Sequence, residues 1–309
     1  MLEAGIQSAY WFDWNDPDGS CKKGSEAGIV AVDFGFPGVS TKNDPITSFY
    51  DKSLEEIIEV FTPFKAAFEK YGMIVSQCHA PFPLWVKDRP EFNDYMIMVM
   101  EKICAVCEFI GCPAIVAHGI TRSTKEKEWA TNMEMYGRMI PAAKKHGVKI
   151  CLENLFTGFH GHVVGGVCST AEEAVKYLDT LNEMAGADCF GFCLDTGHAN
   201  LVGANIRQYL NTIGSRLTCL HIHDNNGIED VHMLPYTQTH NWGQYTYLDW
   251  EGFIEGLRDI DYKGSLCFET FRVMQVTPVP VWPEMLRTIT AMGRYFADRV
   301  SAPKEAAAE

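Results

Sequence analysis

Short apolar runs alternate with helix-type patterns along the whole chain, and this alternation most restricts the folds open to it. Eight segments have the length and composition of strands: 4–9, 29–34, 74–79, 114–118, 149–153, 191–195, 218–221 and 265–269. Between them, apolar residues recur at helical spacing around 54–68 and 96–110, and further helices are expected near 126–146, 170–184, 204–214, 249–259 and 283–297. Strands that alternate with helices predict a parallel α/β fold.

The number of predicted strands indicates which α/β fold to expect. Eight strands with intervening helices in 309 residues is the count of a (β/α)8 TIM barrel, whose working groups lie at the carboxyl ends of the strands. A doubly wound sheet is the alternative, but it gathers side chains from four strand ends less easily. No linker rich in Pro, Gly and Ser divides the sequence. We therefore predict a single-domain barrel over residues 1–300 and a flexible tail over 301–309.

Four of these strands end in the same pattern, which is a Cys, one apolar residue and then a side chain that can bind a metal. The triplets are Cys151-Leu152-Glu153, Cys193-Leu194-Asp195, Cys219-Leu220-His221 and Cys267-Phe268-Glu269. Because side chains alternate along a strand, the Cys and the residue two positions later point the same way. The four last residues form a mixed oxygen and nitrogen set that suits Mn, Co or Zn better than calcium. We predict that Glu153, Asp195, His221 and Glu269 hold one divalent ion, while the cysteines pack inside the barrel.

Charge and composition exclude several classes of partner. The formal charge of -14, from 40 acidic and 26 basic residues, repels nucleic acid and anionic membranes. The sequence contains no apolar run near the roughly 18 residues that a membrane span needs, and no secretion signal is recognised. Eleven cysteines, an odd number, favour reduced thiols over a disulfide framework. We therefore expect a cytoplasmic protein that binds neither nucleic acid nor membrane.

The ordered strand-end motifs together resemble a known superfamily. They are Cys78-His79-Ala80-Pro81, Glu153-Asn154, Asp195-Thr196-Gly197-His198, His221-Ile222-His223-Asp224, Asp230-Val231-His232 and Phe268-Glu269-Thr270. From about residue 3 to 297 the chain is similar to the xylose isomerase-like TIM-barrel superfamily, in its sugar phosphate isomerase/epimerase branch. That superfamily also holds ketose 3-epimerases, inosose isomerases and dehydratases, and endonuclease IV type repair enzymes. The resemblance implies that Glu153, Asp195, His221 and Glu269 are metal ligands, and that Glu153 and Glu269 form an acid/base pair.

These residues predict a metal-dependent sugar or polyol isomerase or epimerase. One carboxylate removes a proton next to a carbonyl, a metal-stabilised enediolate forms, and the other carboxylate returns the proton. We expect one Mn, Zn, Co or Mg ion and no organic cofactor. The substrate is expected to be a small carbohydrate or polyol bound by the catalytic-rim residues His79, His118, His198, His232, Trp242 and Arg272. Aromatic residues at the rim raise the further expectation of a homo-oligomer.

Two alternative functions remain open beside the sugar isomerase or epimerase. An endonuclease IV type phosphodiester hydrolase needs a longer set, and all nine residue types are present: His79, His118, Glu153, Asp195, His198, His221, Asp230, His232 and Glu269. The negative charge of the chain disfavours that reading, because repair enzymes must hold phosphates. An inosose dehydratase, or a subunit of a sugar-cleaving complex, is the second. For His223 we expect a side chain that points away from His221, with packing given at least as much weight as function.

Overall fold

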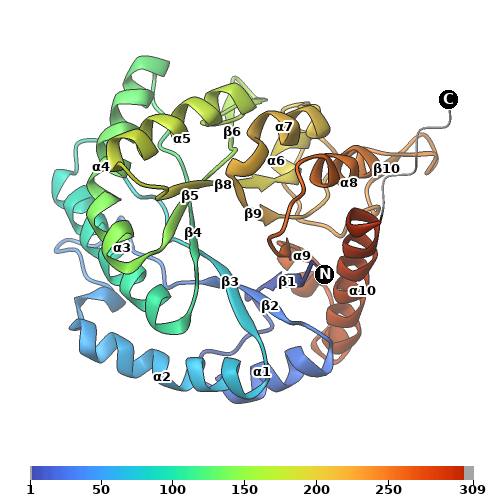
Figure 1. Ribbon diagram of the computed structural model, residues 1–309, viewed down its shortest axis with the longest axis horizontal. Helices are drawn as coiled ribbons and strands as arrows, with labels where there is room; N and C mark the ends of the chain where they lie inside the picture. Colours follow the sequence, from blue (N-terminus) through green and yellow to red (C-terminus); the bar gives the residue numbers. More distant parts are fainter. Residues whose placement is uncertain (1, 303–309) are drawn as a thin grey trace.

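The computed structural model describes residues 2–302, and within them eight parallel strands form a ring with helices outside it (Figure 1). The strands of the ring are β1 (Ala4–Gln7), β2 (Ala31–Gly35), β3 (Ile74–His79), β4 (Ala114–Ala117), β5 (Lys149–Glu153), β8 (Phe190–Asp195), β9 (Leu217–His221) and β12 (Leu266–Phe268). Each overlaps one of the eight predicted segments, so the predicted TIM barrel is confirmed. Apolar runs of this kind are buried on both faces in a parallel sheet, which is why they are recognisable.

The ring closes between the seventh and eighth strands. Neighbouring strands follow chain order from β1 to β9, and β12 pairs with β1. On the other side, the Ile222 N–H donates to the Cys267 carbonyl at 2.8 Å, and the Glu269 N–H donates to the Ile222 carbonyl at 3.1 Å. Because every strand runs in the same direction, all eight carboxyl ends lie at one rim.

The helices outside the ring have clear start and stop signals in the sequence. Ser53 forms a capping box with Glu56 at the start of one helix, and Gly111, Gly147 and Gly186 end three others in the left-handed conformation. Their bounds are α1 (Pro17–Glu26), α2 (Leu54–Lys70), α3 (Pro90–Ile110), α4 (Lys125–His146), α5 (Ala171–Ala185), α6 (Thr196–Leu201), α7 (Ile206–Ile213), α8 (Trp250–Asp259), α9 (Phe271–Val276) and α10 (Trp282–Ser301), with 3-10 turns η1 (Phe49–Asp51), η2 (Gly214–Arg216) and η3 (Val279–Val281). The predicted helices correspond to α2, α3, α4, α5, α7, α8 and α10.

Several elements were not predicted. Helix α1 is mostly polar and buries Ser20, Cys21 and Gly24, so it lacks the apolar periodicity that identifies a helix. Two hairpins follow strand ends at the rim: β6 (Phe156–Phe159) with β7 (His162–Gly165), and β10 (Thr239–His240) with β11 (Tyr245–Thr246). Helix α10 continues to Ser301, and the predicted tail lies outside the described residues from position 303 on. Among the described residues, no helix is both long and apolar enough to cross a membrane.

The barrel interior is filled by small side chains below the rim. Cys151, Cys193 and Cys219 form a buried cluster there with Ala114 and Val116. The sulfur atoms of Cys151 on β5 and Cys219 on β9, which only β8 separates in the ring, are 3.6 Å apart. Cys267 on β12 is buried as well, with its sulfur 3.3 Å from the Ser76 hydroxyl on β3. The four cysteines of the triplets therefore pack inside the barrel below the rim, as compact hydrophobic residues do.

A larger aromatic core between the barrel and its helices gives a first test of the fold. Phe34 on β2 is fully buried. Its ring centre lies 5.2–5.8 Å from the ring centres of Trp14, Phe12 and Phe64. We expect Phe34→Ala to lower the free energy of unfolding by about 3–5 kcal/mol, because it removes these contacts and leaves a cavity. Urea unfolding of the wild type and the variant measures this change in the free energy of unfolding. Phe159→Ala, at a ring that is 63% exposed, is the control, and a loss as small as that control's would contradict this packing.

Candidate functional site

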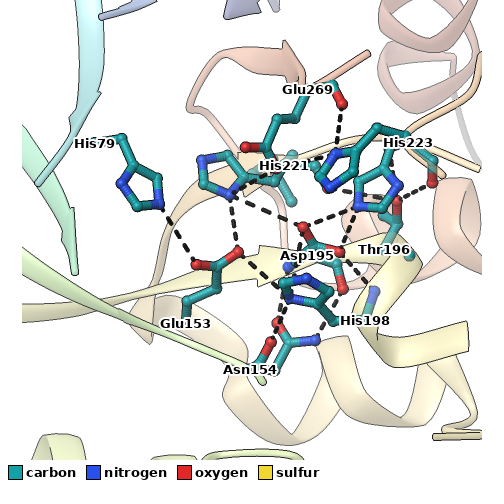
Figure 2. A network of polar contacts seen from close by, with 12 residues as sticks. His79, Glu153, Asn154, Asp195, Thr196, His198, His221, His223 and Glu269 are labelled. Atoms are coloured by element: carbon teal, nitrogen blue, oxygen red, sulfur yellow. Dashed lines mark hydrogen bonds and ion pairs between the residues drawn. The ribbon is translucent and has the colours of Figure 1, made fainter. Parts of the chain in front are cut away.

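Four strand ends bring the predicted metal ligands to one point at the rim. Glu153, Asp195 and His221 are the last residues of β5, β8 and β9, and Glu269 follows β12 directly. One ligand atom from each of the four lies within 4.8 Å of the other three. His221 Nδ1 is central: it lies 2.9 Å from Glu153 Oε1, 3.5 Å from Glu269 Oε2 and 4.0 Å from Asp195 Oδ2 (Figure 2). The structure therefore brings together the four predicted ligands.

The electrostatics of this group favour a bound cation. All four side chains are buried, with Glu269 the most exposed at 8%. Burial lowers the pKa of His221, but the surrounding acidic groups, Glu269 and Glu153 among them, outweigh burial and hold that pKa well above its usual range. Burial raises the pKa of Glu269, and Asp195 and Glu153 act in the same direction. Three carboxylates around a single imidazole leave excess negative charge away from water, and a divalent cation offsets it. The residues therefore fit a metal.

Two histidines from β3 and the end of β4 extend the site beside Glu153. His118 Nε2 lies 3.0 Å from Glu153 Oε2, and His79 Nε2 lies 3.2 Å from His118 Nε2. The Nδ1–H of His79 donates to the Ala80 carbonyl at 2.7 Å, which leaves Nε2 of the neutral ring as an acceptor. Burial and the neighbouring His118 lower the pKa of His79 to about 4, so this ring is neutral near pH 7. His79 Nε2 can therefore accept from a sugar hydroxyl or bind a metal, whereas His118 Nε2 faces two acceptors and is the donor in these contacts.

A second extension lies on the opposite side of Asp195. His198 Nδ1 donates to the Asn154 carbonyl at 2.9 Å, and His232 Nδ1 donates to the Glu269 carbonyl at 2.9 Å. The Nε2 atoms of both rings face Asp230 Oδ2, at 3.4 Å and 3.0 Å. A carboxylate and two imidazole acceptors meet favourably only when the rings are protonated or a cation lies among them.

The charges of these two rings follow from the same contacts. Burial lowers the pKa of His198, but Asp195 and Asp230 outweigh it and raise the value to about 10. Burial also lowers the pKa of His232, but Asp230 and Glu269 outweigh burial and raise that pKa to about 9. In the metal-free protein both rings are therefore cationic near pH 7, and they offset part of the carboxylate charge.

The predicted direction of the His223 side chain was wrong. Its Nε2 lies 2.9 Å and 3.0 Å from the two carboxylate oxygens of Asp195, and its ring stacks on His232 with centroids 4.0 Å apart. Residues two apart in an extended chain share a face, so His221 and His223 both point into the site. The spacing of two residues between His221 and His223 was the sequence signal that could have identified His223 as a site residue.

Asn154 belongs to one of the strand-end motifs, but no role in the site was predicted for it. Its side-chain amide donates to the Asp195 carbonyl at 2.8 Å and its oxygen accepts from the Asp195 N–H at 2.8 Å. These two bonds tie the end of β5 to the end of β8. The Glu153-Asn154 motif was the sequence signal that could have indicated this role.

Two predicted substrate-binding residues lie away from this cluster. Trp242 is fully exposed in the turn between β10 and β11, and β10 lies at the periphery of the molecule in Figure 1. Arg272 is exposed at the start of α9, where its guanidinium donates to Gln275 Oε1 at 2.9 Å. The structure brings neither side chain to the ligand group, and a substrate contact by either stays a prediction. Phe271, the neighbour of Arg272, does reach the site, with its ring 4.3 Å from that of His232.

The close approach of Gly197 to His223 provides a test of this geometry. A Cβ atom at Gly197 would lie 1.9 Å from His223 Cε1, far closer than atoms can approach. We expect Gly197→Ala to displace the ring from Asp195, to cost about 1–3 kcal/mol of stability and to weaken divalent-ion binding. Denaturant unfolding and bound metal per chain measure the two effects. Gly38→Ala, where no described atom lies within 4 Å of the new Cβ, is the control, and identical behaviour of both variants would contradict the geometry.

Comparisons with known proteins agree with this architecture. A family model described as xylose isomerase-like TIM barrel matches residues 29–292. The chain is 26% identical over 189 residues to the inosose isomerase of Bacillus subtilis, a match that covers 60% of this chain and 63% of that protein. It is 29% identical over 126 residues to the D-psicose 3-epimerase of Enterocloster bolteae, covering 40% of this chain and 36% of that protein. The matched parts span between 31% and 63% of the length of the curated relatives.

A solved structure shares the fold over nearly the whole chain. D-psicose 3-epimerase from Clostridium cellulolyticum H10, determined with D-tagatose, superimposes with a TM-score of 0.70 at 19% identity. The superposition covers 96% of this chain and 99% of that chain. The common barrel extends from end to end of that enzyme.

Proposed function

This chain belongs to the xylose isomerase-like TIM barrel family, and on that basis we propose that it is a metal-dependent isomerase or epimerase of a small sugar or polyol. The observation that carries the proposal is the convergence of Glu153, Asp195, His221 and Glu269, whose ligand atoms lie within 4.8 Å of one another. Such a set of oxygen and nitrogen ligands suits Mn, Co, Zn or Mg. Relatives named for inosose isomerisation and for 3-epimerisation of a ketose support the reaction class.

The two glutamates are proposed to move the proton. They come from β5 and β12, which are separated in the ring by β8 and β9, so they approach a bound sugar from different sides. The Gln7 side-chain N–H donates to Glu269 Oε1 at 2.8 Å and orients that carboxylate. One glutamate takes the proton from the carbon next to the carbonyl, and the other delivers a proton to the product. A bound divalent cation supplies the positive charge that stabilises negative charge developing on the sugar oxygens.

The surrounding rings are proposed to bind the hydroxyl groups of the substrate. His79, His118, His198 and His232 each place an Nε2 atom within the cluster of ligand groups, where hydroxyl groups can donate or accept. Phe82 stacks on His118 with centroids 4.8 Å apart and is 60% exposed, so it offers an apolar face to a sugar ring. Self-association through exposed rim aromatics and a cytoplasmic location stay predictions.

Hydrogen exchange with solvent tests the proposed reaction. The protein, loaded with Mn²⁺ in D₂O, is incubated with ketoses, aldoses and inososes, and the products are analysed by NMR and mass spectrometry. We expect deuterium at one carbon next to the carbonyl, which identifies both the substrate and the site of proton transfer. A protein that binds Mn²⁺ but produces neither exchange nor a new sugar across this screen would contradict the proposal.

A second function is favoured by a specific observation. Among the described residues, four overlapping groups of site residues could each hold a cation. The four-residue set shares Glu153 with His79 and His118, Asp195 with His198 and His223, and Glu269 with His223 and His232. Asp230 lies against His198 and His232. Three adjacent cations would suit phosphodiester hydrolysis. The charge of -14 argues against binding a phosphate backbone, so this function ranks second. Three Zn²⁺ per chain together with cleavage of abasic-site DNA would reverse the ranking.

A further inference from the structure

We propose that Asp33 is a positioning residue that fixes the tautomer of His221 and thereby directs His221 Nδ1 toward the metal. Asp33 lies on β2 and His221 on β9, so the contact crosses the interior of the barrel. This inference rests on the metal centre of the proposed function and assigns a role to a residue outside its ligand set. No sequence motif pointed to Asp33.

The two nitrogens of His221 face different partners. Nε2 lies 3.0 Å from Asp33 Oδ2, whereas Nδ1 faces Glu153, Glu269 and Asp195. An ionised carboxylate can only accept a hydrogen bond, so Nε2 must carry the proton in this contact. When His221 holds a cation, its ring is neutral, and the lone pair is then on Nδ1. The tautomer required for binding is therefore the one that Asp33 selects.

Gln77 on β3 holds Asp33 in place. Its Nε2 donates to Asp33 Oδ2 at 3.0 Å and to the Leu220 carbonyl at 3.1 Å, while its Oε1 accepts from the Leu220 N–H at 3.4 Å. The network thus spans β2, β3 and the residue that precedes His221. Each of its members is at most 2% exposed, so water cannot replace a missing partner.

The position of the ring is also restricted by packing. The rings of His221 and His79 stack with centroids 5.6 Å apart and an interplanar angle of 14°. Packing alone would allow the ring to turn over about its Cβ–Cγ bond, because both orientations have nearly the same shape. That turn would place Cδ2 and Cε1 where Nδ1 and Nε2 now lie. The hydrogen bond to Asp33 distinguishes the two orientations. A negative charge beyond the ring also makes Nδ1 a stronger electron donor to the cation.

Two substitutions separate the parts of this role. Asp33→Asn keeps an oxygen that can accept from Nε2 but removes the charge, whereas Asp33→Leu removes the acceptor and keeps a side chain branched at Cγ. We expect Zn²⁺ affinity, measured by competition with a chromophoric chelator, to fall about 10-fold in the first and about 100-fold in the second. Thr290→Val, which removes a buried hydroxyl from α10, is the matched control and should bind Zn²⁺ as the wild type does.

A spectroscopic measurement distinguishes positioning from general damage to the fold. In the Zn²⁺-loaded wild type with ¹⁵N-labelled histidine, we expect His221 to show a protonated Nε2 and a metal-bound Nδ1. Asp33→Asn should keep this pattern and Asp33→Leu should lose it, and circular dichroism of each apo-variant checks that it folds. If Asp33→Leu does not fold, Asp33→Asn alone decides, through its loss of affinity.

Failure of this inference can be told apart from failure of the proposed function. If the wild type binds Zn²⁺ and the folded variants bind it equally well with an unchanged ¹⁵N pattern, Asp33 has no positioning role and the metal centre stands. A wild type that binds no divalent ion would overturn the proposed function, and this inference with it.

Discussion

Replacement of Glu269 by Gln should lower turnover on the ketose or inosose substrate by a factor on the order of 10²–10⁴, with little change in fold. The amide has nearly the same shape as the carboxylate, but it cannot take up a proton at neutral pH. Glu269 is buried, and without a metal its burial and its acidic neighbours Asp195 and Glu153 raise its pKa. Steady-state kcat with saturating Mn²⁺ measures the effect.

The Glu269→Gln result needs a control for the loss of a buried carboxylate. Glu128 in α4 is 3% exposed and pairs with Lys125 at 2.7 Å, and it belongs to none of the ligand groups described above. Glu128→Gln should therefore lower stability without lowering kcat per folded molecule. Metal content of each variant shows whether Glu269→Gln still holds its ion. Wild-type kcat in Glu269→Gln would exclude this residue as a proton carrier.

Removal of the metal should abolish turnover and also destabilise the fold. A cation that binds only the folded site stabilises it by about 2.7 kcal/mol when its free concentration is 100 times Kd. Chelation removes that contribution and leaves the carboxylates of Glu153, Asp195 and Glu269 close together without the ion. We expect EDTA to lower the thermal midpoint and to reduce turnover to background, and added Mn²⁺ to restore both.

Glu153→Gln is the matched variant for the chelation experiment. Glu153 Oε1 contacts His221 and its Oε2 contacts His118, so the substitution weakens the four-ligand set at its most connected residue. Its thermal midpoint should respond much less to EDTA than that of the wild type. If chelation leaves wild-type turnover intact while metal analysis shows the ion is gone, the reaction does not depend on the metal.

The fold was largely predictable because its signals are local. All eight barrel strands overlap predicted segments, since apolar runs of four to six residues between turn residues are typical of strands buried on both faces. Helix α1 was missed for the converse reason: its buried positions are Ser20, Cys21 and Gly24, which carry no apolar periodicity. The rim hairpins were missed because strands of two to four residues are too short to show a clear alternation of apolar and polar residues.

The sequence by itself determined the register of the four ligands. Each Cys-apolar-ligand triplet specifies which residue faces the barrel axis, because the side-chain period of a strand is two. The same rule, correctly applied, places His223 beside His221. Eight strands predict a barrel, and a barrel places all four strand ends at one rim. The sequence alone therefore groups Glu153, Asp195, His221 and Glu269.

Only the tertiary structure decided which groups touch across the barrel. The contact of Asp33 with His221 joins β2 to β9, and Gln77 supports it from β3, although 188 positions separate Asp33 from His221 in the chain. Likewise, the rings of His198 and His232 both turn Nε2 toward Asp230 because backbone carbonyls of other strands take their Nδ1 protons. The periodicity of a strand predicts the direction in which a side chain points. The closure of the barrel and the stagger of its strands determine which other residues that side chain contacts.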